Sequence, residues 1–566
     1  MLTKKHHQVF TFGFILCLIF APHFKAENIK TPLEENQFTR YSQNEDIALF
    51  LSQAVHLSPQ LAVKVVGRTR ETRNYDAHDF FICILTEERI SAPSELNRVK
   101  PTFLIVAGQH GNEQSAKEAA LWLIRDLAIG ELKPLLKKVN FLIIPQANPY
   151  GNWFNQRRNE QDLDLNRDHV KLESPEAKAI HRVFRIWMPE VTMDVHEKGD
   201  DFYRVSIGCV SNINIHPQLQ AFSRQTILAE VASNLEKKGI TFHEYLVTQP
   251  MGLDSSAGVT YSPEDQGERE TMMRYSTTDL NDGRNSLGIY ESFSFIQEGA
   301  SRHDLETLEE RTRWQYSGLR FLSESIARHG QEINTIVHQL REQLLEKAQV
   351  YSEDDLVHLR MRYARDEEQP TLTIKRFQRS DTPIQGILNK DKKAGDPLTR
   401  EDLNPYPYPS RSKIVEEAVK NWFPGIEPTV SVSRPLGYII PAKHQDVVKT
   451  LLHHGLKVDL FKQDLALEIE VYKVVGITPA RYDYLPPQMI EVLKTDLQTI
   501  IKKGDYFVSC AQEGANLISC LLEPQSQYGF IRYWRFGLVP EKDNLFPFLR
   551  VVKKAELPLI PYRPWR

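Results

Sequence analysis

The residues best suited to bind a metal ion follow an apolar segment near the start of the chain. Residues Thr102–Ala107 are rich in apolar and β-branched side chains and predict a buried strand. His110 and Glu113 come directly after it, and the apolar spacing of Ser115–Asp126 predicts a helix. Open α/β sheets bind ligands at such strand-to-helix junctions. Imidazole nitrogen and carboxylate oxygen are ligands that zinc accepts, so His-x-x-Glu is a candidate half of a zinc site.

A third ligand candidate stands at the end of another predicted strand. Val191–Val195 is a short apolar segment, and His196 follows it. If this strand neighbours the first one in the same sheet, His196 lies at the same edge as His110 and Glu113. Catalytic zinc sites use three protein ligands and keep a fourth position for water, so these residues predict a catalytic rather than a structural site.

A zinc hydrolase also needs a carboxylate that takes a proton from water. Glu298 ends the predicted strand Ser292–Gln297 and is our candidate for this general base. Glu291 is the alternative, although it precedes the strand and is expected at its other end. Glu197 is adjacent to a predicted ligand, and we expect it to be solvated or to support that ligand from outside the site.

A long polar loop between two predicted elements carries groups that bind anions. It contains Arg157, Arg158, Asn166 and Arg167. An arginine fork holds a carboxylate through two hydrogen bonds, and an asparagine amide adds a further donor. The alternative is a calcium loop of the EF-hand type over Asp162–Glu173, but Arg167 stands where that loop requires glycine.

These motifs, in this order, resemble the zinc carboxypeptidases of the carboxypeptidase A type. The resemblance extends over roughly residues 45–330. It is carried by His110-x-x-Glu113, Asn148-Pro149-Tyr150-Gly151, Arg157-Arg158-Asn159, Asp164-Leu165-Asn166-Arg167-Asp168, His196, and the segment from Asn285 to Glu298.

The resemblance implies roles for the catalytic residues. His110, Glu113 and His196 would bind one zinc ion. Glu298 would act as general base and acid toward a zinc-activated water. Arg157 would polarise the scissile carbonyl and stabilise the oxyanion.

The resemblance also implies a substrate end of the site. Asn166 and Arg167 would hold the terminal carboxylate of a peptide, and Asp164 would orient His110. The tyrosine that clamps substrate in this family has no clear counterpart, and Tyr275 lies at about the right place in the sequence. Gly299 follows the predicted base where many relatives carry threonine or leucine.

Alternating strands and helices predict an α/β fold with a mixed, largely parallel sheet and helices on both faces, followed by a smaller α+β domain. At 566 residues the chain is too long for one core. We expect a signal peptide at 1–26, a carboxypeptidase-like catalytic domain at 27–350, strands and a linker at 351–410, and a C-terminal accessory domain at 411–566.

The composition limits the kinds of partner that the protein is expected to bind. The 70 basic and 74 acidic residues give a net charge of −4, which offers no electrostatic surface for nucleic acid. Near the N-terminus, Val9–Ala21 is apolar, follows basic residues, and is shorter than the roughly 20 residues of a membrane span. We therefore expect cleavage after Ala26 and export to the periplasm or the medium, with an uncleaved anchor as the alternative. Of the cysteines, Cys510 and Cys520 are the closest pair in sequence.

The sequence thus predicts an exported zinc metallocarboxypeptidase that acts on peptides with a free C-terminal carboxylate. The first alternative is an amidohydrolase that cleaves N-acyl amino acids on the same metal site. The second is a catalytically inactive peptide-binding protein on this scaffold.

Overall fold

The computed structural model describes residues 29–199, 201–250, 271–275, 277–301, 307–378, 413–479 and 486–564. The predicted signal peptide and most of the predicted linker lie outside these ranges, as do residues 251–270.

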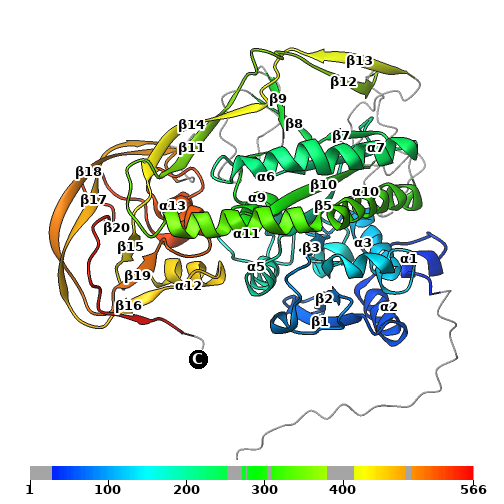
Figure 1. Cartoon of the computed structure of the whole chain (residues 1–566), viewed down its shortest axis with the longest axis horizontal. Coiled ribbons are helices and arrows are strands. Elements are labelled where there is room, and N and C mark those ends of the chain that lie inside the picture. The colour runs from blue at the N-terminus through cyan, green and yellow to red at the C-terminus, as the bar shows by residue number, and fades with distance from the viewer. Residues whose placement is uncertain are drawn as a thin grey trace, which may run out of the picture.

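Within the described residues, the N-terminal domain is built around an eight-stranded sheet (Figure 1). Its strands, in spatial order, are β1 (Leu61–Arg68), β2 (Asp79–Leu85), β4 (Asn140–Ile144), β3 (Thr102–Ala107), β5 (Val191–Lys198), β10 (Phe293–Ala300), β6 (Val205–Cys209) and β7 (Phe242–Glu244).

The middle of this sheet is parallel. Strands β4, β3, β5 and β10 run in the same direction, whereas β1 and β2 pair antiparallel at one side and β6 pairs antiparallel with β10. The carboxyl ends of β3, β5 and β10 therefore meet at one edge. This confirms the predicted mixed, largely parallel sheet.

Helices cover both faces of the sheet. Helices α3 (Gln114–Ala128) and α10 (Leu308–Arg328) pack on one face, and α5 (Pro175–Trp187) and α9 (Gly283–Gly288) pack on the other. The remaining helices of this domain are α1 (Pro32–Glu35), α2 (Asn44–Leu57), α4 (Pro149–Trp153), α6 (Pro217–Phe222), α7 (Ala229–Lys237) and α11 (Gly330–Lys347).

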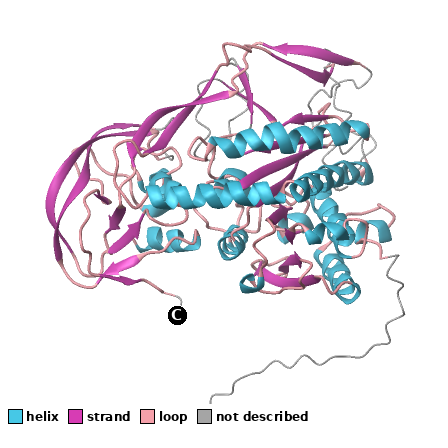
Figure 2. Cartoon of the chain, in the orientation of Figure 1, coloured by secondary structure: helices cyan, strands magenta, loops and turns pink. Residues whose placement is uncertain are grey.

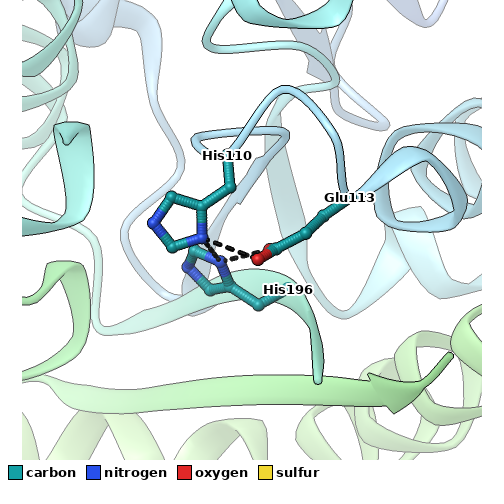
Figure 3. Close-up of side chains that lie close together, drawn as sticks. All are labelled: His110, Glu113 and His196. Atoms are coloured by element: carbon teal, nitrogen blue, oxygen red, sulfur yellow. Dashed lines mark hydrogen bonds and ion pairs between the residues drawn. The ribbon is translucent and has the colours of Figure 1, made fainter. Parts of the chain in front are cut away.

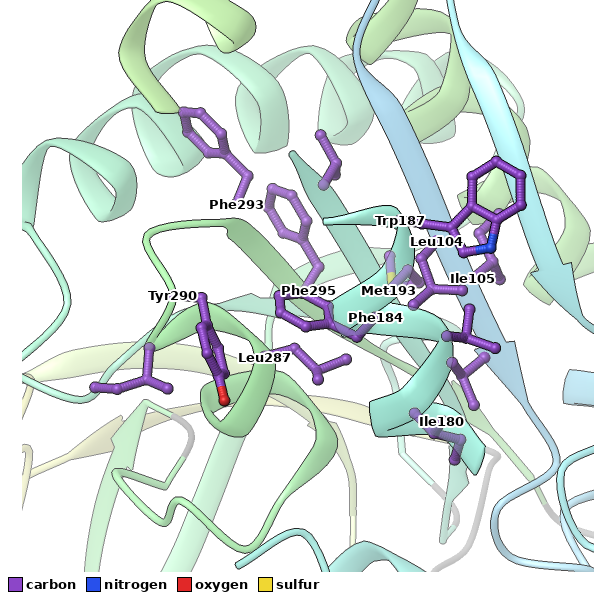
Figure 4. Close-up of a cluster of buried hydrophobic side chains, with 14 of the residues drawn as sticks. Leu104, Ile105, Ile180, Phe184, Trp187, Met193, Leu287, Tyr290, Phe293 and Phe295 are labelled. Atoms are coloured by element: carbon purple, nitrogen blue, oxygen red, sulfur yellow. The ribbon is translucent and has the colours of Figure 1, made fainter. Parts of the chain in front are cut away.

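The central strands are buried on both faces, which explains their continuous apolar sequences. Every residue of β3 and β10 is buried. Figure 4 shows part of the resulting core, where side chains of α5 such as Phe184 and Trp187 lie near Leu104, Met193 and Phe295 of the sheet.

Some predicted strand bounds match the structure, and others differ from it. Strand β3 has the predicted bounds. Strands β5 and β10 extend to Lys198 and Ala300, so His196 and Glu298 lie within strands rather than after them.

The C-terminal domain is an antiparallel sheet with two helices (Figure 2). Its strands in spatial order are β18 (Met489–Ile501), β17 (Leu465–Thr478), β20 (Leu549–Val551), β15 (Gly437–Ile440), β19 (Tyr506–Ser509), β16 (Asp459–Phe461) and β21 (Leu559–Pro561). The helices are α12 (Gln445–His453) and α13 (Ala515–Leu522). This confirms the predicted smaller α+β domain.

Three two-stranded ribbons complete the described structure. They are β8 (Leu246–Pro250) with β9 (Thr271–Tyr275), β11 (Leu356–Ala364) with β14 (Gly425–Ser433), and β12 (Leu372–Phe377) with β13 (Ile414–Val419). Strands β11 and β12 lie within residues 351–410, where the sequence predicts strands. Cys83, Cys209, Cys510 and Cys520 are buried free thiols. Across the described residues, every helix is too short or too polar to cross a membrane.

The two domains share one continuous hydrophobic core. Polar contacts reinforce their interface: the Tyr290 hydroxyl donates to the His454 carbonyl over 2.8 Å, and the Asn516 amide donates to the Glu291 carboxylate over 3.1 Å.

Candidate active site

Three predicted metal ligands converge at the carboxyl edge of the sheet (Figure 3). His110 and Glu113 lie in the turn between β3 and α3, and His196 lies near the end of the adjacent strand β5. The Nδ1 atoms of His110 and His196 each lie 2.8 Å from an oxygen of Glu113 and 3.0 Å from each other. One ligand atom from each residue fits within 4.8 Å, and all three residues are buried.

Two aspartates fix the tautomers of these histidines. His110 Nε2 lies 3.1 Å from Asp164 Oδ1, and His196 Nε2 lies 2.8 Å from Asp194 Oδ2. A carboxylate only accepts hydrogen bonds, so these aspartates favour the tautomer with the proton on Nε2, in which Nδ1 has a lone pair for a metal ion. Carboxylates commonly orient metal-binding histidines in this way.

The electrostatics of the cluster favour a cation. Burial by itself raises the pKa of Glu113, but His110 and His196 outweigh burial and hold this pKa well below its ordinary value. Burial lowers the pKa of His196, but Asp194 and Glu113 raise it well above its ordinary value. The carboxylates around the two rings therefore create a negative potential at this place, which favours a bound cation.

These observations fit a zinc ion. The donor set of two imidazoles and one carboxylate is the one used by catalytic zinc sites. Both Nδ1 lone pairs point at one place, and the opposite nitrogen of each ring is already engaged. His110, Glu113 and His196 would hold the ion.

The turn that carries His110 is pressed against the polar loop that follows β4. A Cβ added at Gly111 would stand 1.9 Å from the carbonyl carbon of Gly151, so glycine is required for this close approach. Asn148 caps helix α4, since its side chain accepts from the Gly151 amide over 2.8 Å. The same side chain donates to the Gln109 and Arg157 carbonyls and ties the two segments together.

Arg157 thereby reaches the metal cluster. Its Nε donates to Asp164 Oδ2 over 2.8 Å, and its Nη1 lies 3.1 Å from His110 Nδ1 and 3.6 Å from Glu113 Oε1. The side chain is 42% exposed, so a substrate has access to this guanidinium.

Asn166 lies beside His196, and Arg167 follows it in the same loop. Asn166 Nδ2 is 3.0 Å from His196 Nε2, and Asn166 Oδ1 accepts from the Gly283 amide at the start of α9 over 2.7 Å. Burial lowers the pKa of Arg167, but Asp279, Asp164 and other acidic neighbours raise it overall.

Glu298 lies next to the cluster on strand β10. It pairs in register with His196 on β5. Burial raises the pKa of Glu298 above its ordinary value, and the histidines only partly oppose this rise. Glu291, by contrast, lies before the other end of β10 and accepts hydrogen bonds from the His216 amide and Asn516.

Tyr275 takes a different position. Its ring packs edge-on against Trp422 with a centroid separation of 4.8 Å, and the guanidinium carbon of Arg224 lies 4.2 Å from its centroid. The tyrosine beside the cluster is Tyr245, whose side chain is hydrogen-bonded to Glu298.

Sequence reasoning missed the supporting residues Asp194, Gln109 and Tyr245. Asp194 was detectable, because it lies two residues before His196 in a strand and so faces the same side. Gln109 donates to Asp194 over 2.7 Å. Tyr245 belongs to no sequence motif that could have identified it. Glu197 is buried, paired with Arg311 over 2.7 Å and bonded to Ser115 on the opposite face of the sheet.

Comparisons with known proteins agree with this geometry. Residues 48–184 match the family model described as zinc carboxypeptidase. Carboxypeptidase 2 of Trichophyton rubrum is 24% identical over 466 residues, covering 78% of this chain and 75% of the relative. Carboxypeptidase 2 of Trichophyton tonsurans is 25% identical over 470 residues with the same coverage. A crystal structure of a putative carboxypeptidase A from Shewanella denitrificans is 21% identical, covers 51% of this chain and 70% of that chain, and has a TM-score of 0.37.

The matched family segment contains His110 and Glu113 but ends before His196 and Glu298. Geometry supplies these later residues, because the sheet brings them to the same edge as the matched ones. Residues 48–184 thus resemble the zinc carboxypeptidases, and the relatives that align with most of the chain are named carboxypeptidases.

Proposed function

We propose that this protein is an exported metallocarboxypeptidase that removes the C-terminal amino acid of a peptide. One observation carries the proposal. A buried His-Glu-His cluster has a carboxylate, Glu298, in register with His196 on the neighbouring strand, and Asn166, next to the half-buried Arg167, in contact with the same histidine. This arrangement provides a base, a metal position and an anchor for a terminal carboxylate. The apolar segment after basic residues at the N-terminus supports export.

Glu298 is suited to receive a proton from water and return it to the leaving amine. Burial raises its pKa, which brings its proton affinity closer to neutral pH, where general acid–base catalysis is most efficient. A zinc ion bound at the cluster would supply Lewis acidity, polarising the carbonyl and lowering the pKa of water.

Arg157 is suited to stabilise negative charge on the carbonyl oxygen. Its Nη1 faces the cluster, and its Nε is held by Asp164, so the guanidinium is oriented before substrate binds. Preoriented donors of this kind need no reorganisation as charge develops. Asn166 and Arg167 would hold the terminal carboxylate, as amide and guanidinium donors do.

A panel of matched substrates tests the proposal. Purified, zinc-loaded protein should cleave peptides with a free C-terminus and leave the same peptides intact when the C-terminus is amidated. Preferential cleavage of N-acyl amino acids would instead support an amidohydrolase. A zinc content well below one equivalent after reconstitution would contradict the enzymatic proposal.

Substitution of the base gives a second test. Glu298→Gln should retain zinc and lower kcat by at least about 10²-fold, the usual size of a general acid–base contribution. Glu291→Gln is a matched control, because this buried carboxylate lies at the other end of the same strand. Near-normal kcat in Glu298→Gln would assign the proton transfer to another group.

A further inference from the structure

Arg284, on helix α9, is a fully buried arginine whose guanidinium is only partly hydrogen-bonded. Its Nη2 donates to the Thr277 carbonyl and lies 3.1 Å from Asp282 Oδ2. Its Nε and Nη1 are buried and have no hydrogen-bond partner among the described residues. Leaving a buried donor unpaired costs about 1–3 kcal/mol, and more when the group is charged. These two donors therefore need an explanation beyond the fold.

The unpaired Nη1 lies over strand β6, beside the catalytic edge of the sheet. A Cβ added at Gly208 would stand 3.3 Å from Arg284 Nη1, 3.2 Å from Tyr245 Cβ and 3.4 Å from Ile296 Cγ2. These three side chains thus meet above a glycine that leaves room for them. Ile296 and Glu298 are two residues apart on β10 and face the same side of the sheet, so Arg284 lies on the side of the proposed base.

Arg284 also lies at the end of the site where Arg167 is found. Both arginines are close enough to Tyr245 to oppose the rise in its pKa that burial and Glu298 cause. Asp282 interacts with both of them. Two guanidinium groups therefore flank one tyrosine, which is itself hydrogen-bonded to Glu298.

The acidic groups near Arg284 are already engaged elsewhere. Asp282 Oδ1 accepts from the Asn285 amide, and its other oxygen accepts from Arg284 Nη2 over 3.1 Å. Glu244 is bound by Arg224 Nε over 2.9 and 3.0 Å. The Nε and Nη1 edge of Arg284 is thus left as a pair of charged donors, the geometry that binds a carboxylate through two hydrogen bonds.

We propose that Arg284 binds a carboxylate on the side chain of the substrate's last residue, and that the enzyme therefore prefers peptides ending in glutamate or aspartate. The inference rests on the proposed carboxypeptidase activity, in which Arg167 takes the terminal carboxylate. Arg284 then binds the second carboxylate, which belongs to the side chain of the last residue. A site built to hydrogen-bond a substrate group rejects substrates that lack it, because its own buried donors are left unpaired.

Peptides that differ only in the last residue test this preference. Zinc-loaded full-length protein is assayed on peptides ending in Glu, Gln, Leu or Lys, with all other residues identical. The Glu-ended peptide should have kcat/KM at least about 10²-fold above the Gln-ended one, which has the same shape without the charge. Equal or faster cleavage of the Gln-ended or Leu-ended peptide would overturn the inference while leaving the proposed function intact. Failure to cleave any peptide with a free C-terminus would overturn both.

Substitution connects the preference to this residue. In Arg284→Met, the Glu-to-Gln ratio of kcat/KM should fall to within a few fold, while Arg320→Met, at a partly exposed ion pair on α10, should keep the wild-type ratio. An unchanged ratio in Arg284→Met would contradict the assignment. Calorimetry on wild-type protein gives a readout without turnover. Free L-glutamate should bind more tightly than free L-glutamine, and equal affinity would count against the inference even if the variant does not fold.

Discussion

Asp194 offers the sharpest test of how the histidine ligands are prepared. Its Oδ2 lies 2.8 Å from His196 Nε2, and its Oδ1 accepts from Gln109 Nε2 over 2.7 Å. In Asp194→Asn, the Gln109 donor requires the amide oxygen on its own side, which turns the new NH₂ group toward His196. A donor there requires His196 Nε2 to accept, and the ring proton then moves to Nδ1, the atom expected to bind zinc.

The size of the effect follows from the bond that is lost. A hydrogen bond to a charged group contributes about 1.5–3 kcal/mol, roughly twice a neutral one, and here the replacement donor also favours the wrong tautomer. We therefore expect zinc affinity to fall by about 10- to 100-fold, the range typical of groups that support metal ligands. At saturating zinc, much of the activity should return.

Zinc affinity is measured by competition with a chelator of known affinity, alongside thermal unfolding of the metal-free protein. Asp168→Asn is the matched control. Asp168 is equally buried and accepts from the Ser174 amide over 2.7 Å, so its replacement should lower Tm without weakening zinc binding. Zinc affinity within about twofold of wild type in Asp194→Asn would refute the tautomer argument. An equal loss in both variants would point to general destabilisation.

Three further changes probe the interface between the domains. Burial lowers the pKa of His454 from 6.5 to about 4, so its stabilising contribution is present above pH 6.5 and is lost as pH falls toward 4. His454→Gln keeps a donor for the Val170 carbonyl and should remove about 3 kcal/mol of this acid dependence, as measured by denaturant unfolding. Burial raises the pKa of Glu291 from 4.5 to about 7, so its contribution to stability is present below pH 4.5 and is lost as pH rises through 7. The free energy of unfolding of Glu291→Gln should therefore depend less on pH over that range, and an unchanged slope of this free energy against pH would contradict the prediction. Tyr528→Phe removes a 2.6 Å hydrogen bond to Thr278 and should lower kcat/KM several-fold at unchanged zinc content, whereas a loss confined to Tm would indicate a purely structural contact.

The convergence of the three candidate metal ligands could be predicted because each follows directly from local sequence. The apolar segment Thr102–Ala107 fixes a buried strand, and the polar residues after it must lie at the sheet edge. His196 follows a second strand of the same kind, and parallel pairing of β3 with β5 then brings the histidines together. In each case, the residues that specify the strand, the turn and the candidate ligand lie within a few positions of one another in the sequence.

The substrate end could not be read in the same way, because it depends on distant contacts. Arg284 lies in a six-residue helix with no apolar periodicity, and its position is set by Gly208 on β6 and by Tyr245. Strand β6 is a short segment, and no turn signal in the sequence identifies the strand with which it pairs. Its antiparallel pairing with β10 is determined by tertiary contacts. Tyr275 shows the same difficulty, since its place in the sequence suggested the site but the ribbon of β8 and β9 directs it toward Trp422.

The C-terminal domain bears on catalysis through the segment that leads into α9. Thr278 is held by the hydroxyls of Tyr528 and Tyr363, and Asn281 donates to the hydroxyl of Tyr533. This same segment supplies the Thr277 carbonyl that fixes Arg284. The alignments with the Trichophyton carboxypeptidases cover 78% of the chain, so the similarity extends beyond the predicted catalytic domain at 27–350. A domain without a catalytic motif thus supports the segment that carries the proposed substrate-binding Arg284, and changes in its tyrosines should alter substrate turnover before they alter metal binding.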